Sequence, residues 1–175
     1  MSGYLLALSG IAVTFGGLVA LFMVVRQLLG GRFTPLDLLA VRNFLSFAFF
    51  IASAGLVPHA LAALHVGDTL VWRLSSALAM LPIVWHVATT AARRRRALGG
   101  QVRPASWNVA AANYASALAA LIYGFILIGP AAAPLPGLYV LAATGLMLMT
   151  FYGFYATLDS LYAPLGGARV AEPEG

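Results

Sequence analysis

Long runs of apolar residues, separated by short segments that carry most of the polar residues, dominate the pattern along this chain. A helix needs about 20 mostly apolar residues to cross the hydrocarbon core of a bilayer. Five segments meet that requirement, at residues 4–25, 38–57, 70–92, 109–128 and 138–158. The pattern therefore predicts an all-α fold, an integral membrane bundle of five transmembrane helices that forms a single domain over residues 1–163. Residues 164–175, which include Gly, Pro and Glu, are expected to form a short disordered cytoplasmic tail.

Prolines and capping residues mark the expected helix ends. The segment Thr34–Asp37 has the pattern of an N-cap, a proline at the first helical position and an acid in the first turn. Pro58 is expected to close the second helix, and Gly129–Pro130 the fourth. Pro82 lies inside the third segment, where it is expected to kink the helix because proline removes a backbone donor and clashes with the preceding turn.

Arginine positions predict the orientation of the bundle in the membrane, because cytoplasmic loops carry an excess of basic residues. Arg32 lies between the first and second segments, and Arg93–Arg96 with Arg103 follow the third. The two remaining loops contain no arginine. We therefore expect the N-terminus outside and the C-terminus, with Arg169, in the cytoplasm. The run Arg93–Arg96 is also a candidate contact for anionic lipid headgroups, at about 1 kcal/mol per residue.

Composition excludes several classes of protein. The chain is 62% hydrophobic and 9% charged, whereas a soluble domain is about 45–50% apolar and about 25% charged. It contains no cysteine, which excludes disulfides, thiolate metal sites and cysteine nucleophiles. The net charge of +5 comes without a basic face interleaved with aromatic residues, so nucleic acid is not an expected partner. The absence of lysine beside abundant alanine, glycine and arginine suggests GC-rich coding, and with it a bacterial cytoplasmic (inner) membrane.

Polar residues at membrane depth are the candidate functional groups, because such residues are costly in lipid. Most of them lie toward the predicted cytoplasmic ends of the helices. They are Arg26, Asp37, Arg42, Asn43, His86, Asn108, Asn113 and Asp159. We predict that part of this set converges on a cytoplasm-facing polar vestibule. Its candidate residues are Arg42, Asn43, His86, Asn113 and Asp159.

Two of these residues have competing interpretations. In the structural interpretation, Arg42 extends toward the headgroups, or pairs with Asp37 or Asp159 to hold helices together. In the functional interpretation, Arg42 binds an anionic substrate or lipid headgroup. His86 is either a hydrogen-bonded helix-contact residue, or a proton relay or haem or metal ligand. Haem is disfavoured because no second histidine lies at the same depth, and we predict no cofactor.

The predicted outer side carries a second, weaker polar group. His59, His65 and Asp68 are side chains of the kind that zinc or copper accepts, but their spacing matches no specific motif. An ordinary outer loop is therefore favoured, and no metal is predicted. Arg73 is expected to extend outward and to pair with Asp68.

Three functions remain open from the sequence. The favoured one is a non-enzymatic channel or transporter component, or an accessory subunit, in which His86 and Asp159 are candidates for proton coupling. The second is a membrane-embedded enzyme acting on a lipid or hydrophobic anionic substrate, with His86 and Asp159 as acid and base and Arg42 on a phosphate. The third is a scaffold or sensor that binds another membrane protein. Stripes of small residues on the first and fourth segments are expected to be internal helix contacts, although a homo-oligomer or a partner membrane protein stays open.

Overall fold

The computed structural model describes residues 2–28, 34–99, 107–130 and 133–167. At residues 2, 36, 107–109 and 159–167 it describes only the backbone. Five helices account for nearly all of this part of the chain. They are α1 (Ser2–Leu28), α2 (Pro35–Ala63), α3 (Asp68–Ala97), α4 (Trp107–Ile128) and α5 (Leu135–Gly167). All five are long and apolar enough to cross a membrane. The predicted all-α bundle of five transmembrane helices is confirmed, and the chain is a small multi-pass membrane protein.

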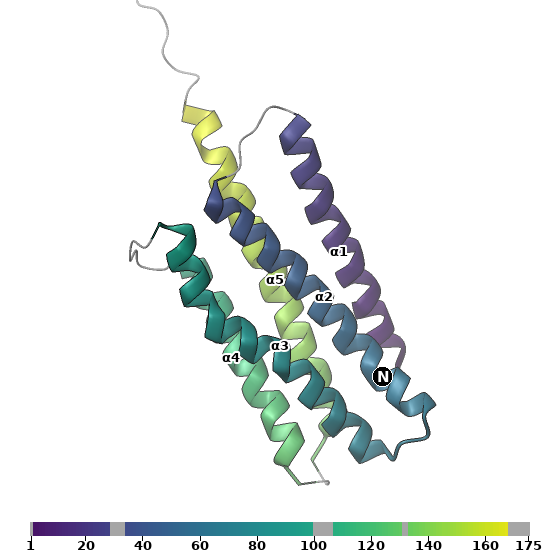
Figure 1. Ribbon diagram of the computed structural model, residues 1–175. Helices are drawn as coiled ribbons and strands as arrows, with labels where there is room; N and C mark the ends of the chain where they lie inside the picture. The colour runs from purple at the N-terminus through teal and green to yellow at the C-terminus, as the bar shows by residue number, and fades with distance from the viewer. Residues whose placement is uncertain (1, 29–33, 100–106, 131–132, 168–175) are drawn as a thin grey trace, which may run out of the picture.

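Successive helices run in opposite directions (Figure 1). From α2 to α5 each helix packs against the next, and α5 packs back against α2, so these four surround a common core. α1 lies on the outside and packs mainly against α2. One end of the bundle carries Arg26 and the run Arg93–Arg96, and we call it the arginine end. The other end, near His59 and Gly129, we call the opposite end.

The start of α2 follows the prediction, but its end does not. The Thr34 side chain accepts a hydrogen bond from the backbone of Asp37, and the Asp37 carboxylate accepts one from the backbone of Thr34. Pro58 was expected to close this helix, and that prediction is wrong, because α2 continues through Pro58 to Ala63. Pro58 has no N–H for the carbonyl of Ala54. The hydroxyl of Tyr139 in α5 donates to that carbonyl at 2.7 Å. This hydrogen bond avoids the free-energy cost of a carbonyl without a donor inside a membrane protein.

The arginine run also differs from its predicted setting. We expected it in a loop after residue 92, but α3 continues to Ala97 and contains Arg93–Arg96 in its last turns. Basic side chains are favourable there because the end of a helix carries a partial negative charge. Pro82 lies inside this continuous helix, and its predicted kink stays a prediction. α5 reaches Gly167 and so includes the first residues of the expected tail, whereas residues 168–175 lie outside the described part.

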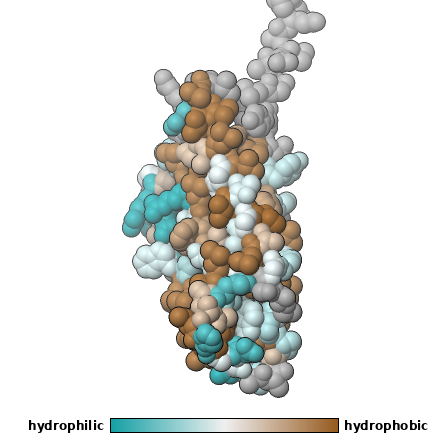
Figure 2. Space-filling model, turned by 90° about the vertical axis from the view of Figure 1, so that its right-hand side faces the viewer, coloured by the Kyte–Doolittle hydropathy of each residue, from teal (hydrophilic) through white to brown (hydrophobic). Residues whose placement is uncertain are grey.

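The contact between α1 and α2 is close. α1 turns one face toward α2, with Leu5, Ala12 and Val19 fully buried on it. Ser9 on the same face donates to the carbonyl of Ala52 at 2.9 Å. At Gly55 there is no room for a side chain, because an added Cβ would lie 2.5 Å from the Leu5 carbonyl oxygen. Seen from the α1 side, apolar residues extend over much of the height of the surface among paler ones, with hydrophilic patches at the left edge and near the foot (Figure 2).

Candidate functional site

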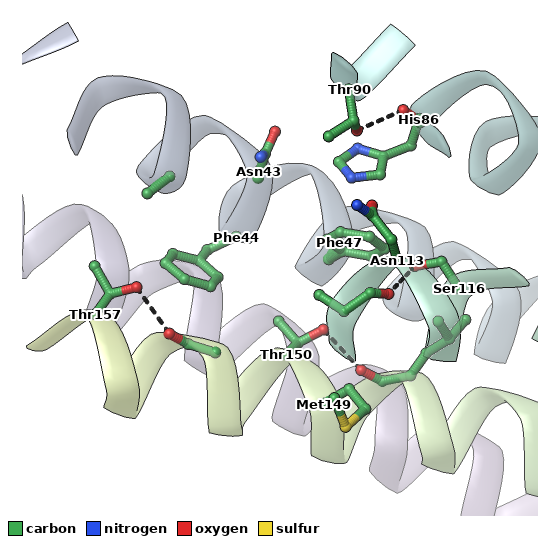
Figure 3. Close-up of a pocket in the computed structure, with 14 residues that line it drawn as sticks. Asn43, Phe44, Phe47, His86, Thr90, Asn113, Ser116, Met149, Thr150 and Thr157 are labelled. Atoms are coloured by element: carbon green, nitrogen blue, oxygen red, sulfur yellow. Dashed lines mark hydrogen bonds between the residues drawn. The ribbon is translucent and has the colours of Figure 1, made fainter. Parts of the chain in front are cut away.

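A pocket of about 130 Å³ lies between α2, α3, α4 and α5 (Figure 3). All four helices contribute polar residues, and α2, α4 and α5 also contribute small or apolar ones. Its polar side chains are Asn43, His86, Thr90, Asn113, Ser116, Thr150 and Thr157. Its larger apolar side chains are Phe44, Phe47, Leu146 and Met149. The pocket therefore has a mixed wall, with hydrogen-bonding groups set among aromatic and aliphatic ones.

Burial along the pocket shows where it opens. The lining residues nearest the middle of the helices are buried, namely Phe47, His86, Ser116, Leu146 and Thr150. Those nearest the arginine end are partly exposed, namely Ala40, Thr90, Ala112 and Thr157. The pocket therefore has a buried floor near mid-bundle, and its lining residues become more exposed toward the arginine end, which we call its mouth.

The hydroxyl groups of the pocket bind their own helices. Thr90 donates to the His86 carbonyl at 2.7 Å, and Ser116 donates to the Ala112 carbonyl at 2.8 Å. Thr150 does the same to the Leu146 carbonyl at 2.7 Å, and these bonds are drawn as dashed lines in Figure 3. Because the hydroxyl hydrogens are used in this way, these three groups are left as acceptors toward the pocket.

Asn43, His86 and Asn113 behave differently. Within the described part of the chain, their side chains form no hydrogen bond to another residue. His86 is 5% exposed, and its ring packs edge-on against Phe47 with the ring centroids 4.5 Å apart. In Figure 3 the His86 ring and the Asn113 amide extend into the same space. An amide both donates and accepts, and a neutral imidazole does so through its two nitrogens, so this trio can bind a group that does both.

The structure brings together only part of the predicted vestibule. Asn43, His86 and Asn113 line one pocket, as the vestibule hypothesis requires. Arg42 is exposed on α2 and does not line it. Asp159 lies on α5, but its side chain is outside the described residues. The five-residue vestibule therefore stays a prediction, as does the acid–base pairing of His86 with Asp159.

Sequence reasoning missed the hydroxyl and aromatic members of the wall. A helical spacing signal was present, because Phe47 and Thr90 each lie four residues after a predicted site residue and Ser116 lies three after another. Residues three or four apart share a helix face. A search three and four residues along the helix from each predicted polar residue would have found these wall residues.

Asp37 and Arg73, two charged residues outside the pocket, have structural partners. Asp37 pairs with Arg26, with the nearest nitrogen and oxygen 3.5 Å apart, which joins the end of α1 to the start of α2. Arg73 was expected to pair with Asp68, and this is wrong, because its guanidinium donates to the Gly129 carbonyl at the end of α4, at 2.7 Å.

The weak metal alternative at the opposite end gains no support. Nδ1 of His59 lies 3.1 Å from the carbonyl oxygen of Gly55, within its own helix. Across the described residues, no three His, Asp or Glu side chains come together.

The chain matches no family model, no curated protein and no solved structure. Its function is therefore inferred from the pocket and from the membrane-spanning architecture.

Proposed function

We propose that this protein is a non-enzymatic component of a bacterial cytoplasmic membrane, either a transporter component or an accessory subunit, that binds a small solute in the pocket between α2 and α5. The observation that carries this proposal is the trio Asn43, His86 and Asn113, whose side chains line one pocket without a described protein partner. Unpaired polar groups at membrane depth are costly. A solute that forms hydrogen bonds with them offsets that cost.

The chemistry of the wall favours binding over catalysis. Among the described lining residues there is no carboxylate, and the hydrogen-bonding groups are amides, hydroxyls and one imidazole. Such groups recognise a solute without supplying a strong nucleophile or a paired acid and base. Arg42 does not line the pocket, so the enzyme alternative loses the residue expected to hold a phosphate.

Closure at one end favours a binding site over an open pore. Beyond the floor of the pocket, Tyr123 and Tyr139 are fully buried with their rings 5.1 Å apart. A pocket that opens at one end is the arrangement expected of a transporter in one access state, or of a subunit that senses a solute. With the predicted orientation, that opening faces the cytoplasm.

A retention experiment tests the proposal. Protein in lipid nanodiscs is incubated with a defined mixture of small neutral, zwitterionic and anionic metabolites, and the retained solutes are identified by mass spectrometry. We expect at least one solute to be retained by the wild type and to fall about tenfold in Asn113→Leu, which corresponds to about 1.4 kcal/mol of binding free energy. Gln27→Leu is the matched control, because it removes an amide from an exposed position on α1. Equal retention by the two variants, or no retention at all, contradicts the proposal.

A second measurement separates the two forms of the proposal. The retained solute is offered to proteoliposomes, and its uptake is compared between wild type and Asn113→Leu. Uptake that requires Asn113 identifies a transporter component. Binding without uptake, together with a partner protein that co-purifies from the native membrane, identifies an accessory subunit.

A further inference from the structure

The four arginines of the run Arg93–Arg96 lie on two faces of α3, just beyond the pocket. Thr90 lines the pocket, and Arg93 and Arg94 lie three and four residues farther on, which places them on the same helix face. Both are partly buried, whereas Arg95 and Arg96 are exposed. The outward pair lies instead with Ala91 and Ala92 on the outer surface of α3. Arg93 and Arg94 therefore lie on the pocket-facing side of α3, one turn beyond Thr90.

The described charges around the mouth of the pocket are predominantly positive. Asp37 is paired with Arg26, so that pair adds no net charge. No other carboxylate side chain is described at the arginine end, and the side chain of Asp159 on α5 is outside the described residues. Arg94 has a further interaction of its own, so the inference below rests on Arg93.

We infer that the solute is a small organic anion, whose carboxylate or phosphate lies at Arg93 while the rest of the molecule reaches Asn113 and His86. This inference rests on the proposed function, and adds the class of solute. The guanidinium group forms paired hydrogen bonds with carboxylate and phosphate oxygens. Arg93 lies seven residues beyond His86, or roughly 10 Å along the helix axis. A short molecule with an anionic end and a hydrogen-bonding body spans that separation, and Phe44 and Phe47 cover its apolar part.

The absence of cysteine from the chain allows a direct test. A single thiol is introduced as Asn113→Cys, and its labelling rates are measured with two reagents of similar size and opposite charge. These are 2-sulfonatoethyl methanethiosulfonate, which is anionic, and 2-(trimethylammonium)ethyl methanethiosulfonate, which is cationic. Each rate is divided by the rate of the same reagent with a free small thiol. A positive mouth raises the local concentration of the anionic reagent, so we expect a preference for it of about fivefold at low salt, falling as salt is added.

The matched variants remove one arginine each in the Asn113→Cys background. Arg93→Gln is expected to abolish the preference for the anionic reagent, while Arg95→Gln, on the exposed face, is expected to leave most of it. The source of the anion is separated by repeating the measurement in nanodiscs with zwitterionic lipid alone and with added anionic lipid. Protection of the thiol by anionic lipid identifies a lipid headgroup as the natural occupant. Retention of benzoate but not of benzamide by the wild-type protein in zwitterionic nanodiscs, lost in Arg93→Gln, identifies a free organic anion.

The outcomes distinguish this inference from the proposed function. If Arg93→Gln and Arg95→Gln reduce the preference equally, only the general surface charge acts, and the inference of an anionic solute fails. The proposed function survives that result if Asn113→Leu still loses a retained neutral solute. If neither reagent labels Asn113→Cys in folded protein, the pocket is closed and both ideas fail. Folding is checked by the gel-filtration profile and the helical circular dichroism of each variant.

Discussion

The two halves of the α2–α5 bundle differ in whether their polar side chains have protein partners. Toward the arginine end, Asn43, His86 and Asn113 line a pocket and have no described partner. Toward the opposite end, polar side chains reach across to backbone carbonyls, as Tyr139 does to Ala54 and Arg73 to Gly129. Polar side chains thus bind a solute in the first half, by our proposal, and join helices in the second.

The two halves differ in whether their polar groups are enclosed by protein or reach a cavity. The hydroxyl oxygens of Ser75, Ser76 and Tyr123 in the opposite half are also without a described hydrogen bond, yet they are fully enclosed by protein. The groups in the arginine half reach a cavity of about 130 Å³. A buried polar group is a candidate binding group only where a cavity gives a ligand access to it. We therefore expect substitutions in the opposite half to change stability, and those in the pocket to change binding.

The largest expected effect is at Tyr139. Tyr139→Ala removes a fully buried ring that packs against Trp72 and Tyr123, and it should lower the free energy of unfolding by about 3–5 kcal/mol. Tyr139→Phe removes only the hydrogen bond to Ala54 and should cost about 0.6–1.7 kcal/mol. The measurement is reversible unfolding in mixed micelles titrated with dodecyl sulfate, followed by helical circular dichroism. Tyr155→Ala, at an exposed position on the same helix, is the control, and an equal loss there would remove the contrast between the halves.

An intermediate effect is expected at Gly55, in the contact between α1 and α2. In Gly55→Ala the new methyl group would overlap the Ser9 hydroxyl and press on the Leu5 carbonyl. Relieving that overlap requires the helices to separate, and we expect a loss of about 1–3 kcal/mol in the free energy of unfolding. Gly17→Ala is the matched control, because nothing lies within 4 Å of its added Cβ. Alanine is the better helix former, so the control should be neutral or slightly stabilised. A loss in both variants would point to a backbone requirement instead of packing.

Much of the fold follows from the sequence, but helix ends do not. Five apolar runs are enough to predict five helices, and the cap at Thr34 is local chemistry within four residues. Past Pro58, the Ala54 carbonyl receives its hydrogen bond from Tyr139 in a distant helix and not from its own helix. A local pattern cannot contain that information. The same limit applies to Arg73, whose acceptor is the end of α4.

The sequence predicted how deep in the membrane the site residues lie, but not which way their side chains point. Reasoning from membrane depth selected Asn43, His86 and Asn113, which share the pocket. It also selected Arg42, although neighbouring residues on a helix point about 100° apart and so Arg42 and Asn43 cannot share one face. Which of the two faces the core depends on how α2 is rotated against α3 and α5. Only tertiary packing fixes that rotation.

The smallest expected effect on stability is at Asn113. It tests most directly whether polar residues of the arginine half serve binding and not stability. Asn113→Leu replaces an amide that has no described protein partner with an apolar side chain of similar size. The free energy of unfolding should therefore change by less than about 1 kcal/mol, in the direction of stabilisation, since an apolar side chain replaces an amide without a described partner at a half-buried position. The same variant should lose the retained solute. Unfolding in mixed micelles without added solute measures the first effect, beside Gln27→Leu as the exposed control. A loss of more than about 2 kcal/mol would mean that Asn113 holds helices together, and the pocket would then belong with the opposite half as a structural feature.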